Sequence, residues 1–341
     1  MLEAFKALGY EVDVVAGYSP ERKKLIKQIK QNIKNGVKYD FVYSESSTMP
    51  TVLTDKHHLP LNPFLDFGFF GFCKKQGIPI GLFYRDIYWL FDEYYKNLNF
   101  FKSRFAKLFY YYDLFFYKKT LTKLYLPSMK MGEYIPIVNR AVHSPLPPGH
   151  TQLQPNQLSK TPRSENTKLK LFYVGGLSNH YQMHILFEVL TRFPDIEFTL
   201  CTREQEWLSQ KSEYPAQSPN IKVVHKSGEE MTNLLIESDI VSLFVKPQKY
   251  REFAAPVKLY EYLGHAKPII ASTGTLAGEF VKDNGIGWTI DYDAESLAKL
   301  LRQLITSPVM INKIAGNMRH VSEAHTWQAR ATQVANELKG S

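Results

Sequence analysis

One segment of the sequence, residues 253–273, constrains the fold more than any other, because it combines a loop, a helix and a strand in a short stretch. Apolar residues at helical spacing over residues 257–263 predict an amphipathic helix. Gly264 follows, and glycine suits the left-handed conformation that ends many helices. Residues 268–272 then form a β-branched run typical of a buried parallel strand. A helix that leads directly into a buried strand indicates an α/β domain.

The loop before this helix has the features of an anion-binding site. Ala255 and Pro256 have small side chains, so a ligand can approach the backbone. The amides of residues 255–257 and the positive end of the helix dipole would face that ligand, with Val257 at the helix start. Lys258 adds a positive charge for a phosphate, and Glu261, one turn later, would accept hydrogen bonds from a ribose diol. The alternative is an ordinary βαβ segment whose lysine and glutamate are solvated.

Length and composition indicate a globular protein of two domains. The chain has 341 residues, of which 44% are hydrophobic and 22% are charged, and domains usually hold about 100–200 residues. Its two cysteines, Cys73 and Cys201, lie far apart, which excludes a disulfide framework and a cysteine zinc site and suits a reducing compartment. The sequence has no run of about 18 apolar residues that would span a bilayer. We therefore expect a cytoplasmic protein.

Alternating strands and helices predict two parallel-sheet domains. Strands are expected at residues 11–16, 39–43, 78–84 and 124–128 in the first half, and at 169–174, 197–201, 221–224, 240–245, 268–272 and 287–290 in the second. We expect an N-terminal domain at residues 1–145, a proline-rich linker at 146–168 and a C-terminal domain at 169–317. The last segment, 318–341, is predicted to form one helix that crosses back to the N-terminal domain.

A basic segment rich in aromatic residues spans residues 96–130. It holds eight lysine or arginine residues against one acid, Asp113, for a net charge of +7. Five of its aromatic residues repeat at the spacing of one helical face: Phe101, Phe105, Phe109, Tyr112 and Phe116. Two interpretations stay open, a helix on an anionic membrane surface and a core helix with solvated lysines. No recognition motif accompanies the charge, so we expect no nucleic-acid partner.

Residues 253–271 resemble the nucleotide-sugar site of GT-B glycosyltransferases, specifically the retaining family 4 group. Those enzymes carry two glutamates separated by seven residues, and a Gly-x-Pro strand follows the second; Glu261 and residues 267–271 match this second half. The first half departs, because Phe253 stands where the first glutamate is expected and Glu252 is the nearest acid. The resemblance implies the GT-B fold, an α/β architecture of two doubly wound Rossmann-like domains facing a cleft that binds a nucleoside-diphosphate sugar.

The resemblance also assigns residues elsewhere in the second half. It implies that Gly175 and Gly176, after strand 169–174, bring their backbone close to the donor. Arg203 follows strand 197–201 and would join Lys258 on the diphosphate; the alternative is a surface arginine without a ligand. The GT-B type generally needs no metal and the chain has no Asp-x-Asp motif, so we expect no cofactor beyond the nucleotide-sugar substrate.

In the first half, Arg85 and Asp86 follow strand 78–84 and match a loop where many family members place a residue beside the donor sugar and acceptor. Arg85 would steady a phosphate and Asp86 would orient an acceptor hydroxyl, unless the two form a structural ion pair. Residues 44–47 are expected to line the acceptor side. Family members open with a strand and a glycine-rich loop, whereas this chain starts inside the helix that follows them, so we expect an N-terminally truncated protein.

The leading hypothesis is a retaining glycosyltransferase that moves a sugar from a UDP- or GDP-linked donor to a glycan or lipid-linked acceptor. It would act at the inner face of the plasma membrane, in bacterial capsule or exopolysaccharide biosynthesis. Two alternatives stay open. One is a nucleotide-sugar epimerase of the same architecture, and the other is a non-catalytic partner of a glycosyltransferase, which the displaced glutamate and the missing first loop favour.

Overall fold

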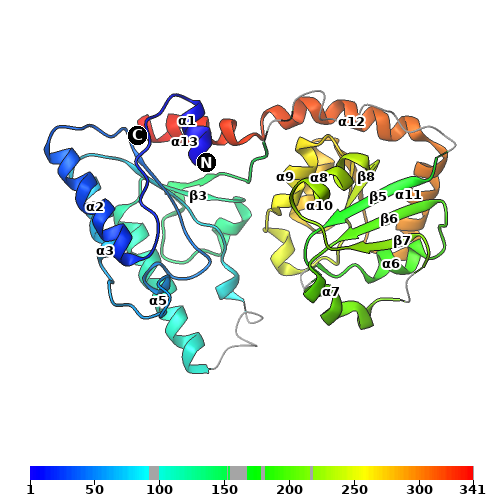
Figure 1. The fold of residues 1–341 in the computed structure, drawn as a ribbon, viewed down its shortest axis with the longest axis horizontal. Helices are drawn as coiled ribbons and strands as arrows, with labels where there is room; N and C mark the ends of the chain where they lie inside the picture. The colour runs from blue at the N-terminus through cyan, green and yellow to red at the C-terminus, as the bar shows by residue number, and fades with distance from the viewer. Residues whose placement is uncertain (92–99, 152, 154–166, 178–180, 216–217, 341) are drawn as a thin grey trace. The chain divides into compact units, whose positions relative to one another are not determined.

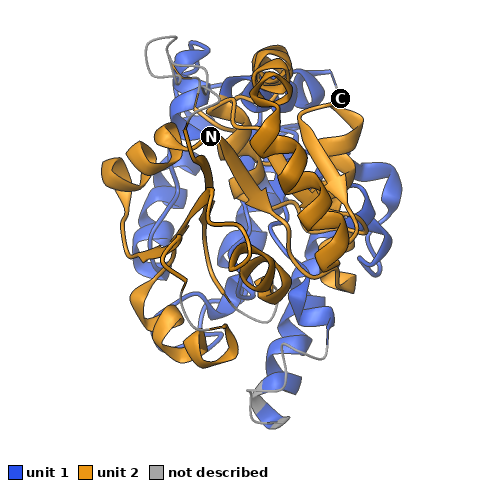
Figure 2. Ribbon diagram, turned by 90° about the vertical axis from the view of Figure 1, so that its right-hand side faces the viewer, with its two compact units in different colours: residues 1–147, 328–341 blue, residues 148–327 orange. Residues whose placement is uncertain are grey.

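The computed structural model describes residues 1–91, 100–151, 153, 167–177, 181–215 and 218–340. The chain divides into two compact units (Figures 1 and 2). Unit 1 comprises Met1–Pro147 and Gln328–Ser341, and unit 2 comprises Pro148–Trp327. The last helix therefore packs with the first unit. Over the described residues, no helix is both long and apolar enough to cross a membrane.

Unit 1 contains a parallel sheet of four described strands in the order β1-β2-β3-β4. Figure 1 shows α1 and α13 together at one end of the unit and α2 beside α3. Its helical and strand elements are α1 (Leu2–Ala7), α2 (Ser19–Lys34), β1 (Val42–Glu45), α3 (Leu65–Lys75), β2 (Ile80–Phe83), α5 (Phe100–Thr120), β3 (Lys123–Leu126), β4 (His143–Pro145) and most of α13 (Trp327–Lys339). Short 3-10 helices lie at Thr51–Leu53 (η1), Tyr88–Leu90 (η2), Lys130–Glu133 (η3) and Arg140–Val142 (η4).

Unit 2 contains a six-stranded parallel sheet in the order β10-β9-β8-β5-β6-β7. Its elements are β5 (Leu169–Val174), α6 (His184–Leu190), β6 (Ile196–Cys201), α7 (Glu204–Gln210), η7 (Lys211–Glu213), β7 (Ile221–Val224), α8 (Gly228–Glu237), β8 (Ile240–Leu243), η8 (Lys249–Glu252), α9 (Val257–Gly264), β9 (Ile269–Ser272), α10 (Leu276–Asp283), β10 (Gly287–Ile290), α11 (Ala294–Thr306) and α12 (Pro308–Glu323). The strand order reverses between β5 and β8. In doubly wound sheets this switch point is where ligands bind.

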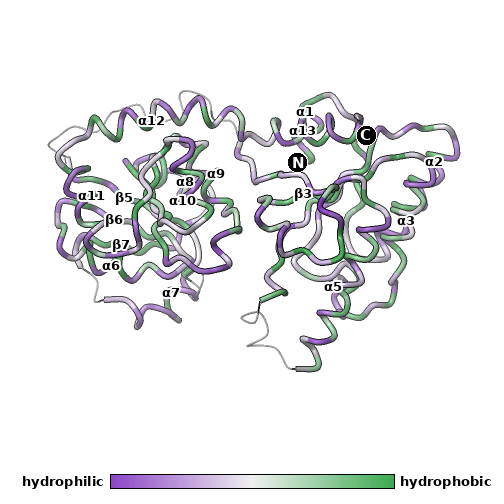
Figure 3. Tube along the Cα trace, turned by 180° about the vertical axis from the view of Figure 1, so that it is seen from behind, coloured by the Kyte–Doolittle hydropathy of each residue, from purple (hydrophilic) through white to green (hydrophobic). Residues whose placement is uncertain are grey.

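The two sheets confirm the expected fold class, a pair of Rossmann-like α/β domains. Two clusters of buried side chains pack against the sheet of unit 2 and include Phe198 and Tyr262. Helices α11 and α12 alternate hydrophobic and hydrophilic residues along their length (Figure 3), as expected for helices that cover a core with one face. Pairing of β5 with both β6 and β8 places that strand at the centre of the unit.

Three predictions of local structure were wrong. Residues 11–16 form no strand, although they have β-branched residues, because a cavity separates them from β1 and leaves them no strand to pair with. The strand expected at 39–43 instead spans Val42–Glu45, where it pairs with β2. The single helix expected from residue 318 is two helices, α12 and α13, because the chain breaks at Thr326 to pair with His150.

The only acidic residue of helix α5 lies on the face that packs against unit 1. Asp113 is buried, and its Oδ2 accepts hydrogen bonds from the Thr51 amide (2.8 Å) and hydroxyl (2.9 Å). Its Oδ1 has no hydrogen-bond partner within the described residues. Burial raises the pKa of this carboxyl to about 7, although the bonds from Thr51 oppose the rise. The charged form is therefore disfavoured in the folded protein at neutral pH.

We expect Asp113→Asn to stabilise the protein more at pH 8 than at pH 5. The folded-state pKa of Asp113, about 7, lies above its ordinary value of 3.8. The wild-type protein therefore loses stability as the pH rises from the ordinary value to the folded-state value. Asparagine keeps the acceptor for Thr51 and does not ionise. Thermal unfolding of variant and wild type at both pH values measures the difference, with the exposed Asp195→Asn as the control. A difference in melting temperature that does not depend on pH would contradict this account.

Candidate functional site

The candidate site lies in unit 2, where the loops after β5 and β8 meet at the switch point of the sheet. The loop after β5 carries Gly175 and Gly176, and the chain after β8 passes through η8 into α9. Pro256 is the N-cap of α9, so its fixed φ leads directly into the helix. The first amides of α9 have no partner inside the helix, which leaves them available to an anion.

Lys258 is the centre of this site. Its side chain is buried, with 9% of the residue exposed, and its Nζ donates a hydrogen bond of 2.7 Å to the Tyr173 hydroxyl. The same Nζ lies 4.2 Å from the centroid of the Tyr173 ring and 3.9 Å from that of the Tyr181 ring. No described carboxylate forms an ion pair with it. Buried lysine is rarely tolerated without such a partner unless it serves a function.

Arg251 brings a second cation to the same ring. Its guanidinium carbon lies 3.7 Å from the centroid of Tyr181, so Tyr181 contacts both Arg251 and Lys258. Arg251 is also buried. Burial, and then repulsion from Arg251, hold the pKa of Lys258 well below its ordinary value. Two cations held this close favour an anionic ligand, because an anion relieves both the repulsion and the loss of hydration.

The two glycines allow charged side chains to approach the backbone. Gly175 has φ of +140°, which favours glycine, and a Cβ at this position would overlap Lys258 Nζ. A Cβ at Gly176 would lie 2.9 Å from Glu206 Oε2. The Gly175–Gly176 pair therefore separates a cation from a carboxylate, with no side chain of its own between them. The structure brings both predicted glycines together with Lys258.

Glu261 lies one turn after Lys258 and is half-buried. Burial raises the pKa of its carboxyl, and the charge of Lys258 opposes that rise. Val257, in contrast, is exposed and does not belong to the buried face of α9. Gly264 is the last residue of the helix, but the left-handed residue is Ala266, with φ of 50°. Gly264 is instead required because a Cβ there would overlap the ring of His150.

Arg203 lies further from this cluster of cations. It is the N-cap residue of α7, its side chain is 86% exposed, and its Nη1 lies 3.5 Å from Glu206 Oε1. Arg251, Tyr181 and Glu206 were not predicted as site residues from the sequence. Their charge or ring was visible in the sequence, but no periodic pattern marks residues in loops or short helices. Only the fold brings them to Lys258.

In unit 1, Arg85 and Asp86 do not pair with each other. Arg85 Nη2 donates to Glu45 Oε2 (3.3 Å), and both side chains are largely exposed. Asp86 Oδ1 accepts hydrogen bonds from the amides of Ile87 (2.7 Å) and Tyr88 (3.0 Å), at the start of η2. Asp86 thus orders its own loop, and the role in acceptor binding stays a prediction.

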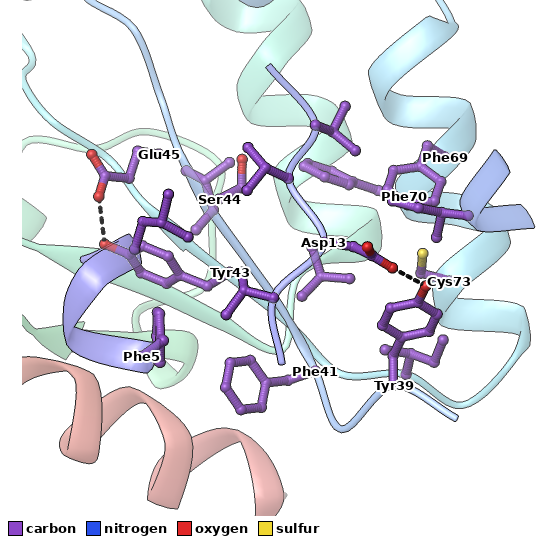
Figure 4. A pocket seen from close by; sticks show the side chains of 18 of the residues that line it. Phe5, Asp13, Tyr39, Phe41, Tyr43, Ser44, Glu45, Phe69, Phe70 and Cys73 are labelled. Atoms are coloured by element: carbon purple, nitrogen blue, oxygen red, sulfur yellow. Dashed lines mark hydrogen bonds between the residues drawn. The ribbon is translucent and has the colours of Figure 1, made fainter. Parts of the chain in front are cut away.

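Unit 1 also contains a cavity of about 1210 Å³. One wall is formed by residues 8–15 and the other by residues 37–47, which include the four residues 44–47 expected on the acceptor side. Figure 4 shows Phe5, Phe41 and Phe69 around it, and Tyr43 donating to Glu45 Oε1 (3.2 Å). The cavity therefore joins aromatic walls to a polar end that carries hydroxyl and carboxylate groups.

In the described parts of both units, no group of three or more histidine, cysteine, aspartate or glutamate side chains is placed to hold a metal ion. That the reaction needs no metal stays a prediction.

Comparison with protein families identifies the domain that carries this cluster. Residues 156–321 match the family described as Glycosyl transferases group 1. A search of curated proteins found no match. The matched residues include β5 to β10 and the whole cluster around Lys258.

Solved structures show the same fold over nearly the whole chain. HepE from Anabaena, in complex with UDP and glucose, is 14% identical with a TM-score of 0.59, over 93% of this chain and 82% of that chain. Sucrose-phosphate synthase from Thermosynechococcus elongatus is 14% identical with a TM-score of 0.58, over 98% and 90%. WaaG, a glycosyltransferase involved in lipopolysaccharide biosynthesis, is 15% identical with a TM-score of 0.54, over 94% and 96%. These similarities show the GT-B fold.

We expect Lys258→Met to stabilise the protein. The lysine is buried beside Arg251 and forms no ion pair with a described carboxylate, and methionine fills a similar volume without a charge. The gain should be about 1 kcal/mol or more, a rise in melting temperature of roughly 2–4 °C. Because the folded-state pKa of Lys258 is lowered, wild-type stability increases as pH rises towards the ordinary value of 10.5. The advantage of the variant should therefore be largest at low pH.

Thermal unfolding between pH 6 and pH 9 measures this effect. The matched control is Lys222→Met, at an exposed lysine in β7, which should change the melting temperature little. A Lys258→Met variant that is less stable than wild type at every pH would show that the lysine contributes to the fold rather than being held there at a cost.

Proposed function

We propose that this protein is a glycosyltransferase that transfers a sugar from a nucleoside-diphosphate sugar, with retention of configuration, to a glycan or lipid-linked acceptor; the match of residues 156–321 to the family described as Glycosyl transferases group 1 supports this. The observation that carries this proposal is the buried pair of cations, Lys258 and Arg251, on the ring of Tyr181. In a nucleoside-diphosphate sugar, the diphosphate is the group that two cations would bind. The proposed pathway is the biosynthesis of a bacterial cell-surface polysaccharide, a capsule or exopolysaccharide, as the resemblance implies.

In this proposal the site acts mainly on the leaving diphosphate. Negative charge develops on that group as the bond to the sugar breaks, and groups already oriented towards it stabilise the transition state. Lys258, Arg251 and the first amides of α9 are the groups available for this role. Arg203 is exposed on the neighbouring loop and would reach the phosphates only by changing its rotamer.

Recognition of the nucleoside is proposed for Glu261. Its half-buried carboxylate follows Lys258 by one helical turn, so it would accept hydrogen bonds from the ribose hydroxyls while the lysine contacts phosphate. HepE, which shares the fold, is complexed with UDP-glucose. That complex favours a uridine nucleotide as the first donor to test, with a guanosine nucleotide as the alternative.

The test of the proposed function is a comparison of UDP with uridine. We expect UDP to bind the wild-type chain. Lys258→Met should lower the affinity for UDP by at least tenfold, about 1.4 kcal/mol, and should change the affinity for uridine little. Glu261→Ala should weaken both, because both carry the ribose. Isothermal titration calorimetry measures these affinities, with GDP as the alternative nucleotide and Lys222→Met as the control. Equal losses for UDP and uridine in Lys258→Met would contradict the phosphate role.

We also propose that unit 1 docks on an anionic membrane through α5. Its buried face carries Tyr110, Asp113, Leu114 and Tyr117, and the opposite face carries a row of exposed apolar side chains. Phe101 is 79% exposed and Leu108 is 63% exposed. We call this row the α5 stripe, and it consists of Phe101, Phe105, Leu108, Tyr111 and Phe115. Successive members are three or four residues apart, so they lie along one side of the helix.

Positive charge accompanies the α5 stripe. Among the side chains described in the same helix, four basic residues are exposed: Arg104, Lys107, Lys118 and Lys119. Lys119 Nζ lies 4.1 Å from the centroid of the Phe115 ring, so charge and apolar surface are adjacent. Helices with exposed aromatic residues among lysines bind at the interface of anionic lipid bilayers. Such a surface would bring the enzyme to a lipid-linked acceptor at the cytoplasmic face of the membrane.

Binding to lipid vesicles tests this surface. Each basic residue near an anionic membrane contributes about 1 kcal/mol, so the double variant Lys118→Glu/Lys119→Glu should reduce co-sedimentation with phosphatidylserine vesicles at least tenfold. Binding of wild type should also fall as salt is raised. Lys222→Glu, in unit 2, is the control. Vesicle binding that is indifferent to salt, to lipid charge and to these substitutions would overturn the membrane proposal.

A further inference from the structure

Glu206 presents a carboxylate oxygen towards the donor side of the site. It lies in α7, after β6, and its Oε2 is buried without a hydrogen-bond partner among the described residues. Its other oxygen, Oε1, is the one that lies near Arg203 Nη1. A buried acceptor without a donor is costly, and native proteins satisfy most such atoms. A donor group supplied by a ligand would satisfy it.

The position of Oε2 indicates which part of a ligand would reach it. Oε2 lies 2.9 Å from the position that a Cβ of Gly176 would occupy. Lys258 Nζ likewise lies close to the position that a Cβ of Gly175 would occupy. Glu206 is also close enough to Lys258 to oppose the lowering of its pKa by burial and Arg251. A ligand whose phosphate contacts Lys258 therefore has Glu206 within reach of the group attached to that phosphate.

Two carboxylates lie near Lys258, and they come from different elements. Glu261 follows Lys258 on α9, and Glu206 approaches from α7 across the two glycines. A nucleotide sugar has two hydroxyl-bearing groups, one on each side of its diphosphate. Two carboxylates from separate elements near the phosphate-binding lysine match this chemistry, because carboxylates only accept hydrogen bonds and hydroxyls donate them.

The residue eight positions before Glu261 cannot perform this role. Phe253 is only 1% exposed and its ring packs edge-on against Tyr250, with 5.3 Å between the ring centroids. The neighbouring Glu252 is exposed in η8. This loop therefore provides no buried carboxylate, and the oxygen nearest to the glycines comes from α7.

We propose that Glu206 is a specificity-determining residue whose Oε2 accepts a hydrogen bond from a hydroxyl of the donor sugar, on the side of the diphosphate opposite to the nucleoside. This inference rests on the proposed function, because it needs a nucleotide sugar at Lys258. It places the recognition of the sugar on unit 2 and assigns neutral sugars with free hydroxyls as the preferred class. A sugar with its own carboxylate would be repelled by Glu206.

The experiment compares a nucleotide with and without its sugar. We expect Glu206→Gln to lower the affinity for UDP-glucose about tenfold relative to wild type and to leave the affinity for UDP unchanged. Glutamine has nearly the same shape but half of its terminal group donates hydrogen bonds, so a donating hydroxyl meets a poorer acceptor. The matched control is Glu204→Gln, an exposed glutamate in the same helix, which should change neither affinity. Isothermal titration calorimetry with the purified protein measures the affinities of each variant for UDP and for UDP-glucose.

The possible results separate this inference from the proposed function. Equal losses of affinity for UDP and UDP-glucose in Glu206→Gln, or no loss of affinity for either, would overturn the role of Glu206 and leave the nucleotide site intact. Wild-type protein that binds neither UDP nor GDP would overturn the proposed function, and the inference with it. A loss confined to UDP-glucose would support it, and UDP-glucuronate should then bind wild type more weakly than UDP-glucose does.

Discussion

Two buried cations that share one half-buried tyrosine ring are the constraint on which the functional part of this structure depends. Lys258 and Arg251 lie within 4 Å of the centroid of Tyr181, and no described ion pair neutralises the lysine. Such an arrangement opposes folding, since each charge loses hydration and the two repel one another. It is consistent with a site prepared for a polyanion, where the free energy of binding offsets the cost that the folded protein carries without ligand.

The α/β fold of unit 2 provides the means of holding these groups. Parallel strands bring the ends of β5, β6 and β8 to one edge of the sheet, so Gly175, Arg203 and the chain leading to α9 arrive from separate parts of the sequence. The two glycines remove side chains where cation and carboxylate must approach the backbone. The helix α9 then contributes its first amides, Lys258 and Glu261 within two turns. Each element is an ordinary part of a Rossmann-like domain.

The sequence predicted the parts of this fold that have a periodic signal. The strands and helices of unit 2 and the anion-binding character of the segment before Lys258 followed from apolar spacing and from a proline at the helix start. The prediction of a strand at residues 11–16 was wrong, because a strand requires a hydrogen-bonded neighbouring strand and β-propensity alone does not provide one. Tyr181, Arg251 and Glu206 were missed because they lie in loops or a short helix, and only tertiary structure joins them. The α5 stripe was foreseen as an aromatic face, but the residues that are exposed on it differ from those with the most regular spacing.

The measurement that tests the central claim most directly is a crystal structure of the protein with UDP bound. The account predicts that the diphosphate contacts Lys258 Nζ and the first amides of α9, with Arg251 beside it and the ribose hydroxyls at Glu261. A nucleotide bound elsewhere in the molecule, with Lys258 still enclosed by Tyr173 and Tyr181 and no phosphate within hydrogen-bonding distance, would contradict it.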